Sequence, residues 1–291
     1  MAIESVTIDN GRTTPLTLSL SNYKETGLLI TNIEGMEHPQ GSITTAKKAV
    51  SDGEMYVSSR LDNRDILIEL RLLGKDAHVQ RNMLYSVVPV KQKVRLTFNT
   101  TLHNRYIEGY VEEHNVDIFD EEPTFKFSVY CPDPHFRDLS SSQIRDNWSR
   151  NFGTFEFPFP REPYSVGDTF QFGVIPLVWD LNFVNEGNVD VGGILTIKVR
   201  KEIDTIGVSV NGDRFLLKKP ADNYPVGTEI VINSVIGEKD VRMNGKSILS
   251  DMDISSVWPV YRSGRNVVKP IGVNRNDVSM QLTLDNLYYG V

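Results

Sequence analysis

Alternating apolar and polar residues dominate the first half of the chain. The alternation has a period of two, it is rich in β-branched and aromatic residues, and each run is bounded by Gly, Asn, Asp or Pro. That combination is typical of half-buried β-strands. Four segments carry it: SVTIDNG (5–11), RDILIELRLLG (64–74), KVRLTFN (93–99) and TFKFSVY (124–130).

One segment, DAHVQRNMLYSVVP (76–89), follows a helical period instead. Asp76 is placed to cap its start, and Pro89 is placed to end it, so the pattern predicts one amphipathic helix of about three turns. Its apolar side must cover either the sheet of its own domain or a neighbouring subunit, and the first alternative is favoured. The candidate residues for the core or for a subunit interface are Val79, Met83, Leu84 and Val87.

The second half of the chain predicts an all-β domain. Asn211-Gly212 and Asn244-Gly245 lie between alternating runs, where a type I′ turn needs positive φ at both central positions. Many short strands with such turns indicate a sandwich. The expected strands lie in LNFVNEGN (181–188), GGILTIKV (192–199), TIGVSVNGDRFLL (205–217), EIVINSVIGEKDVRMNGKSIL (229–249) and VSMQLTLDNLYYG (278–290).

A change in composition and hydrophobic pattern after Phe136 indicates the domain boundary. Residues 137–151 are polar without a clear period, and residues 152–170 are dense in aromatics and Pro, as in a linker that turns into packed extended structure. The fold class is therefore mainly β. We expect an α+β domain with one helix over residues 1–137 and a β-sandwich over residues 138–291.

The octapeptide VYCPDPHF (129–136) raises a chemical question. Cys131 and His135 could pair as a thiolate and an imidazole, but a cysteine nucleophile also needs an oxyanion site and an orienting group. The flanking prolines restrict the backbone and remove two donors, which favours a stiff turn. We therefore interpret the segment as an interdomain joint, formed by Cys131, Pro132, Asp133 and Pro134.

Composition narrows the function classes further. The chain has 291 residues, a formal net charge of −7 and a single cysteine. The negative charge argues against binding of nucleic acid through clustered Lys and Arg, and one cysteine cannot form an internal disulfide. The histidines show no HxxxH spacing, and no nucleotide-binding or hydrolase motif occurs. We expect no enzyme activity, no cofactor, no metal, no secretory signal and no membrane helix, in a protein folded in a reducing cytoplasm.

The segment from Arg105 to Pro123 carries many carboxylates. Ile107 and Val111 share one strand phase, whereas Val116 and Ile118 take the other, so a bulge or turn is predicted near residues 113–114. A solvated strand edge followed by a loop is the favoured interpretation, and a cation site is the weaker alternative. The first four acidic residues of the segment are Glu108, Glu112, Glu113 and Asp117.

Several segments, in this order, resemble one family. They are TNIEG (31–35), DG (52–53), RDILIELRLLG (64–74), QRNMLYSVV (80–88), RYIEGYVEE (105–113) and FSVYCPDPHF (127–136), followed by NEGN (185–188), GGILTI (192–197), VNGDRF (210–215), GTEIVINSVIGEKDVRMNGKSIL (227–249) and SGRN (263–266). The series is similar to the distal tail proteins (Dit) of siphophages and related phage-tail particles, over nearly the whole chain.

The resemblance implies a scaffold rather than an enzyme. Proteins of this family have an N-terminal belt domain, six copies of which close into a ring at the distal end of the tail tube. Their C-terminal galectin-like domains hold receptor-binding or other baseplate proteins. The ring joins the tube protein to a tail-associated hub or lysin protein, and its lumen passes DNA. The expected location is the virion, after assembly in the host cytoplasm.

Two further hypotheses accompany this interpretation. The acidic residues Glu108, Glu112, Glu113 and Asp117 are candidates for the lumen wall, because a wall without Lys and Arg clusters would not retain sliding DNA. The alternative function is a carbohydrate-binding module for host adhesion, in which aromatic side chains stack on sugars. Its candidate residues are Trp179, Trp258, Tyr261, Tyr288 and Tyr289.

Overall fold

The computed structural model describes residues 3–73, 77–117, 123–139, 143–147, 155–156, 171–172, 180–218, 223–274 and 277–291. By the contacts between its residues the chain divides into two units. The first comprises Met1–Ser141 together with Asn286–Val291, and the second comprises Ser142–Asp285. Residues 286–291 were expected in the second domain, whereas the structure groups them with the first. Most of the predicted linker, residues 137–170, lies outside the described residues.

The first unit is built on a nine-stranded antiparallel sheet. Seven strands form a path in the order β2-β1-β7-β8-β9-β6-β3, and β10 pairs with both β8 and β23. The strands are β1 (Ile3–Asp9), β2 (Leu16–Ser19), β3 (Leu28–Glu34), β6 (Arg64–Leu72), β7 (Lys93–Thr100), β8 (Asn104–Val116), β9 (Thr124–Cys131), β10 (Phe136–Asp138) and β23 (Leu287–Tyr288).

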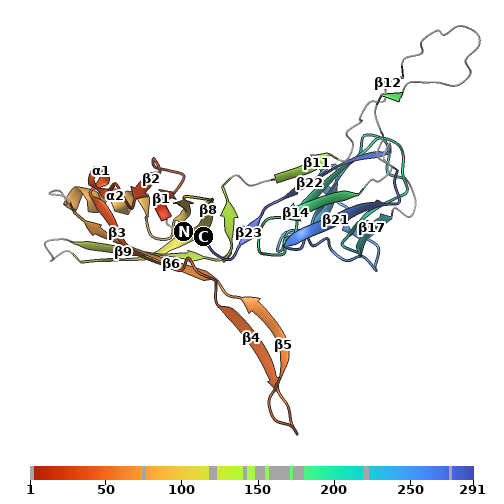
Figure 1. Ribbon diagram of the computed structural model, residues 1–291. Coiled ribbons are helices and arrows are strands. Elements are labelled where there is room, and N and C mark those ends of the chain that lie inside the picture. The colour runs from red at the N-terminus through yellow and green to blue at the C-terminus, as the bar shows by residue number, and fades with distance from the viewer. Residues whose placement is uncertain are drawn as a thin grey trace, which may run out of the picture. The chain divides into compact units, whose positions relative to one another are not determined.

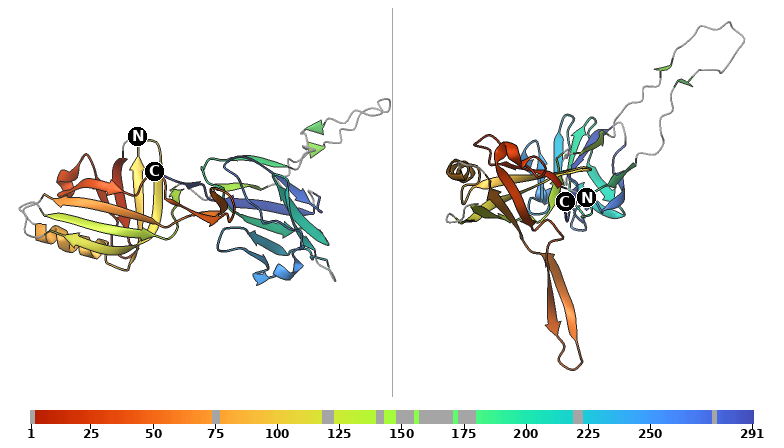
Figure 2. Two further views of the ribbon diagram at one scale, coloured as in Figure 1. Left: turned by 90° about the horizontal axis from the view of Figure 1, so that it is seen from below. Right: turned by 60° about the vertical axis from the view of Figure 1, so that its left-hand side comes forward.

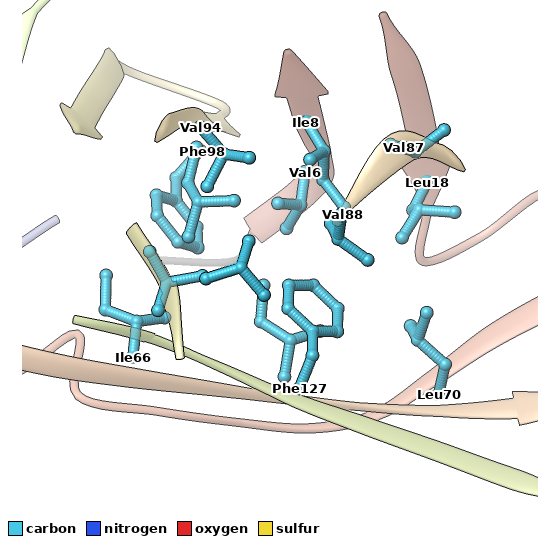
Figure 3. Packing of buried hydrophobic residues seen from close by; sticks show 14 of the residues in the cluster. Val6, Ile8, Leu18, Ile66, Leu70, Val87, Val88, Val94, Phe98 and Phe127 are labelled. Carbon is cyan, nitrogen blue, oxygen red and sulfur yellow. The ribbon is translucent and has the colours of Figure 1, made fainter. Parts of the chain in front are cut away.

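The sheet curves around one hydrophobic core. Figure 3 shows Ile8 and Phe98 from one side of the curved sheet pointing toward Ile66, Leu70 and Phe127 from the other. In β6 the alternation of the sequence becomes an alternation of burial, with every second residue inside. The four strands predicted in this half are all present, because each buries one face against this core.

Helix α2 (Ala77–Val87) lies where the helical period predicted it. Leu84 and Val87 are buried in the core, and Met83 packs against it from a partly buried position. Val79 has a relative exposure of 64%, so it lies outside the core of its own unit. The proposed cap, Asp76, lies outside the described residues. A second, four-residue helix, α1 (Tyr23–Thr26), connects β2 to β3.

The predicted shift of phase in the acidic segment is confirmed. The pairing of β8 with β9 changes register between Val111 and Glu113. A bulge of this kind inserts one residue into one strand and moves the following side chains to the other face. Val116 consequently packs against the core although it is out of phase with Val111.

A hairpin leaves the sheet between β3 and β6. It consists of β4 (Gly41–Lys47) and β5 (Glu54–Leu61), which pair only with each other. Figure 1 and the right-hand view of Figure 2 show it standing away from the rest of the first unit. No strand was expected at residues 41–61, because neither segment alternates between apolar and polar residues over its full length.

The second unit contains a six-stranded sheet in the order β11-β22-β15-β18-β19-β20 and a four-stranded sheet in the order β14-β21-β16-β17. Both predicted Asn-Gly turns are confirmed: φ is 53° and 103° at Asn211 and Gly212, and 48° and 83° at Asn244 and Gly245. The mainly β fold class is confirmed as well. The strands are β11 (Gln143–Asn147), β14 (Leu181–Asn185), β15 (Ile194–Val199), β16 (Thr205–Val210), β17 (Asp213–Lys218), β18 (Glu229–Asn233), β19 (Asp240–Met243), β20 (Lys246–Ser247), β21 (Gly264–Ile271) and β22 (Val278–Leu284), with β12 (Phe155–Glu156) and β13 (Gln171–Phe172) paired separately and one 3-10 turn, η1 (Leu249–Asp251).

Candidate assembly surfaces

The β4–β5 hairpin exposes almost every side chain that it carries. All eight residues of β5 are exposed, and in β4 only Ser42 and Ala46 are partly covered. Much of this exposed surface is apolar. The large apolar side chains are Ile43 at 67%, Val50 at 98%, Met55 at 57%, Tyr56 at 62%, Val57 at 54% and Leu61 at 36% relative exposure.

An isolated two-stranded ribbon is marginal in water, because it has neither a third strand nor a packed face. Its strand edges also present unpaired backbone groups to any other chain. Side-chain hydrogen bonds inside the ribbon join Tyr56 Oη to Ser59 Oγ at 2.8 Å and Thr45 to Glu54. Exposed apolar clusters of this kind mark interaction sites. The hairpin is therefore the first candidate assembly surface.

Arg64 anchors the base of this hairpin. Its side chain is buried and donates hydrogen bonds to backbone carbonyls of three separate segments: Pro134 (Nε, 2.8 Å), Gly35 and Glu37 (Nη1), and Tyr289 (Nη2). Burial lowers the pKa of this guanidinium, and an arginine side chain in a protein keeps its positive charge. The hairpin, the turn after β9 and the C-terminal segment are thereby tied to one side chain.

Gly35, the glycine of the TNIEG motif, shows why the motif has a glycine there. Its φ is +86°, and a Cβ atom would lie 2.1 Å from the carbonyl oxygen of Asp65. Only glycine combines that backbone conformation with so close an approach. The motif glycine and Arg64 of the next motif thus form a single structural joint where the hairpin begins.

The last residues of the chain are held by a second arginine. Arg105 donates to the carbonyl of Gly290 at 2.7 Å, and its guanidinium lies 3.6 Å from the centre of the Tyr288 ring. Phe136 and Arg137 of β10 pair with Tyr288 and Leu287 of β23. The chain therefore crosses between the two units twice. The strand before the first crossing, β10, and the strand after the second crossing, β23, pair with each other as antiparallel neighbours.

Residues 131–134, expected at an interdomain joint, lie within the first unit. They connect β9 to β10, and both strands belong to the same sheet. The sequence correctly indicated a stiff turn leaving a strand, but the chain passes to the second unit only at residues 141–142. The difference arises because the short strand β10 pairs with β8 before the chain leaves.

Cys131 does not have the environment of a nucleophile. It is fully buried, and burial raises the pKa of its thiol to about 12, a shift that the positive charge of Arg64 only partly opposes. A thiol with that pKa stays protonated at neutral pH. His135 contacts Asp133 rather than Cys131, with Nδ1 at 2.8 Å from the carboxylate.

Asp133 holds the turn after β9 together. Burial opposes its ionisation, but hydrogen bonds from His135 and the charge of Arg137, at 3.0 Å, outweigh that effect and keep its pKa below the ordinary value. These contacts join Asp133, which lies between the two prolines, to residues that follow the second proline. They are structural contacts in a partly exposed ion network.

The four acidic candidates of β8 and its end do not form one cluster of unbalanced charge. Glu108 is paired with Lys93 and Arg95, each at 2.6 Å, and these partners keep its pKa below the ordinary value despite partial burial. Glu112, Glu113 and Asp117 are exposed. At Glu108 the two cations thus more than balance the carboxylate, and the exposed carboxylates lie further along the segment.

A second candidate surface lies on the outer face of the sheet, and sequence reasoning missed it. Tyr110 of β8 and Tyr130 of β9 are directly opposite each other, with relative exposures of 47% and 40%. Beside them, the Arg95 guanidinium lies 4.6 Å from the centre of the Tyr106 ring. A pocket of about 190 Å³ opens next to Tyr110 and is also lined by Lys93 and Pro132. Both tyrosines lie on the solvent side of their strands. The sequence had identified these strands only through the residues that face the core.

In the second unit, the NEGN and SGRN motifs interlock. Buried Asn185 donates to the carbonyl of Val189 and accepts from Gly187 N, and Ser263 Oγ donates to the carbonyl of Gly187 at 2.7 Å. Buried Asn266 accepts a hydrogen bond from Asn211 at 2.8 Å. These motif residues satisfy the backbone of two adjacent loops, so their role is structural.

The aromatic residues weighed for sugar stacking are scattered. Tyr261 is fully buried, and Trp258 packs against Phe215 with ring centroids 5.1 Å apart. Tyr288 and Tyr289 belong to the first unit. Trp179 lies outside the described residues. The described aromatics therefore do not build a stacking platform on the second unit.

The described residues contain no group of three or more His, Cys, Asp or Glu side chains arranged to hold a metal ion. Among the helices of the same residues, none has the length and apolar composition needed to cross a membrane.

Comparison with known proteins finds similarity to phage tail proteins, in sequence over part of the chain and in fold over nearly all of it. Residues 18–134 match the family model of the phage tail protein RIFT-related domain. The fold of the chain is similar to the crystal structure of SPP1 Dit (gp 19.1), described as a paradigm of the hub adsorption apparatus in phages that infect Gram-positive bacteria. That likeness has a TM-score of 0.62 and 11% identity, and it covers 96% of this chain and 98% of the other.

Other matches are weaker. A chain of the phage P2 baseplate in its activated conformation with Ca matches with a TM-score of 0.40 and 11% identity, over 97% of this chain and 98% of that one. No curated protein sequence matches. The family match over residues 18–134 and the fold shared with SPP1 Dit agree with the resemblance to siphophage distal tail proteins that the sequence motifs indicated. These findings support a structural role in a phage tail or baseplate.

Proposed function

We propose that this protein is the ring-forming distal tail protein of a siphophage or related particle. Six copies form a ring at the distal end of the tail tube through their first units. The ring joins the tube protein to a tail-associated hub or lysin protein, and its lumen passes DNA. The second units project and hold receptor-binding or other baseplate proteins.

The observation that carries the proposal is the match of residues 18–134 to a phage tail protein domain, in a unit that leaves its β4–β5 hairpin uncovered. A closed ring needs two different complementary surfaces on each subunit. A hairpin with eight consecutive exposed strand residues is suited to be one of them. Cys131 is buried with a protonated thiol, so it does not supply a nucleophile for the hydrolase alternative.

The proposal for the lumen wall includes fewer acidic residues than the sequence suggested. Because Glu108 is neutralised by Lys93 and Arg95, we assign the DNA-repelling role only to the exposed carboxylates Glu112, Glu113 and Asp117. A ring structure with these three side chains on its outer rim would contradict this assignment. The carbohydrate-binding alternative is disfavoured because Tyr261 is buried and Trp258 is packed against Phe215.

The test is the mass of the purified full-length protein, measured by light scattering across a range of concentrations, followed by negative-stain imaging of the largest species. We expect closed six-membered rings with a central hole. Binding of the same preparation to isolated tail tubes tests the junction. A protein that neither assembles alone nor binds tube ends would refute the proposal.

A further inference from the structure

The exposed hairpin and the exposed tyrosine face have complementary properties. We propose that the β4–β5 hairpin of one copy lies across the Tyr110–Tyr130 face of the next copy. This inference rests on the proposed ring function, and it specifies the two surfaces that meet. The occupant of the tyrosine face is thus a second copy of this chain.

Size supports the pairing. A stable protein interface uses roughly 20 to 30 residues on each side. The hairpin spans residues 41–61, and nearly all of its side chains are exposed, so it is long enough to supply one side by itself. Within its own unit it pairs with no other strand, which leaves both of its faces for a partner.

Chemistry supports it as well. Interface centres are enriched in Tyr and Arg, and the receiving face presents Tyr110 and Tyr130 beside the Arg95–Tyr106 stack. The pocket next to Tyr110 has a volume of about 190 Å³. A cavity of about 150 Å³ holds a benzene molecule, so this pocket has room for one side chain of the hairpin, and the charged residues in its lining, such as Lys93 and Asp133, suit a side chain with a polar end.

Charge favours the same arrangement. The chain has a net charge of −7, yet residues 41–61 carry three basic and two acidic side chains. The tyrosine pair lies between groups of both signs: Asp65 is the strand partner of Tyr130, Lys93 is the strand partner of Tyr110, and Glu112 lies further along β8. The ribbon also carries both signs, so opposite charges on the two surfaces can pair and fix the orientation of the contact.

The two surfaces are different, so the contact is heterologous and the test can use complementation. One variant carries Met55→Asp and Val57→Asp in the hairpin, and a second carries Tyr110→Asp and Tyr130→Asp on the face. All four side chains are at least 40% exposed, so both variants should fold. The matched control carries Ile236→Asp and Ile254→Asp, at 80% and 103% exposure, on the second unit.

Assembly is measured by light scattering, and folding is checked by thermal unfolding. We expect each of the first two variants to weaken self-association by at least about tenfold, as loss of a central contact does, whereas the control assembles like the wild type. A mixture of the two variants retains one intact hairpin and one intact face. It should therefore form a species with the mass of two chains and no ring.

Three results would overturn the inference in distinguishable ways. Rings that persist in either variant would remove the hairpin–tyrosine contact and leave the ring function standing. Two variants that fail to assemble alone and also fail to pair in the mixture would show that these surfaces do not meet. A wild-type protein that stays monomeric at every concentration and on tail tubes would refute the ring function together with this contact.

Discussion

Strands β5 and β6 follow each other in the chain, yet they have opposite relations to the rest of the molecule. In β6 every second side chain is buried in the core, whereas in β5 no side chain is buried. Both strands contain large apolar residues. The difference teaches that apolar content alone does not place a strand in a core, because burial also needs a neighbouring surface.

Arg64 lies where the exposed hairpin ends and the strand that packs on the core begins. On its C-terminal side the chain runs through the sheet, and on its N-terminal side it runs through the hairpin. The guanidinium binds carbonyls on both sides of this point, in Gly35 and Pro134. The comparison can therefore be tested by changing the core, the joint and the hairpin separately.

The largest effect is expected in the core. Phe127→Ala, at a residue that is 1% exposed, should lower the free energy of unfolding of the first unit by about 3–5 kcal/mol, because it leaves a cavity. Val57→Ala in β5 should change it by less than about 0.5 kcal/mol. Chemical denaturation of the two variants measures both values. Equal losses would mean that the hairpin is packed as the core is.

The next largest effect is expected at the joint. Arg64→Lys should cost about 3 kcal/mol, because an ammonium group cannot reach the carbonyls of three segments and leaves buried acceptors unsatisfied. Arg60→Lys is the matched control, since the Arg60 side chain is 81% exposed. Denaturation curves of the two variants give the comparison. An Arg64→Lys variant with the same free energy of unfolding as the wild type would contradict the anchoring role.

Removing the hairpin separates stability from assembly. Gly41 and Leu61 are strand partners, so replacing residues 42–60 by Asn-Gly closes a two-residue turn at that point. The free energy of unfolding should change by no more than about 1 kcal/mol, because the hairpin contributes nothing to the core. Light scattering should show loss of assembly. Unchanged assembly would assign the ring contact to another surface.

A smaller effect concerns pH. The pKa of Asp133 is lowered in the folded state, so its contribution is present above the ordinary carboxyl pKa and is lost as pH falls through the lower folded value. Asp133→Asn should therefore cost less than about 1 kcal/mol at pH 7 and flatten the decline in stability below the ordinary carboxyl pKa. Urea denaturation at several pH values measures this. A steeper decline in the variant would reverse the assigned sign.

The smallest effect is expected for the thiol. Cys131 is fully buried and its pKa is about 12, so a thiol reagent at pH 8 should label it only as fast as the protein unfolds. Mass spectrometry over time, with and without denaturant, follows the labelling. Rapid labelling of the folded protein would show that the turn after β9 opens.

Sequence patterns alone determined much of the fold. Local signals were sufficient for strands such as β6, for helix α2, for the bulge after Val111 and for the two Asn-Gly turns, because each depends on residues close together in the chain. The order of the motifs along the chain was also sufficient to indicate the distal tail proteins.

Only the tertiary structure decided the rest. It showed that residues 131–134 lie inside the first unit, that the C-terminal residues return to that unit, and that the hairpin and the tyrosine face remain uncovered. Each of these depends on which distant segments meet. The carbonyl of Tyr289, for example, lies 225 residues from the guanidinium that binds it. No local pattern contains such a contact, because it exists only when the whole sheet has closed around the core.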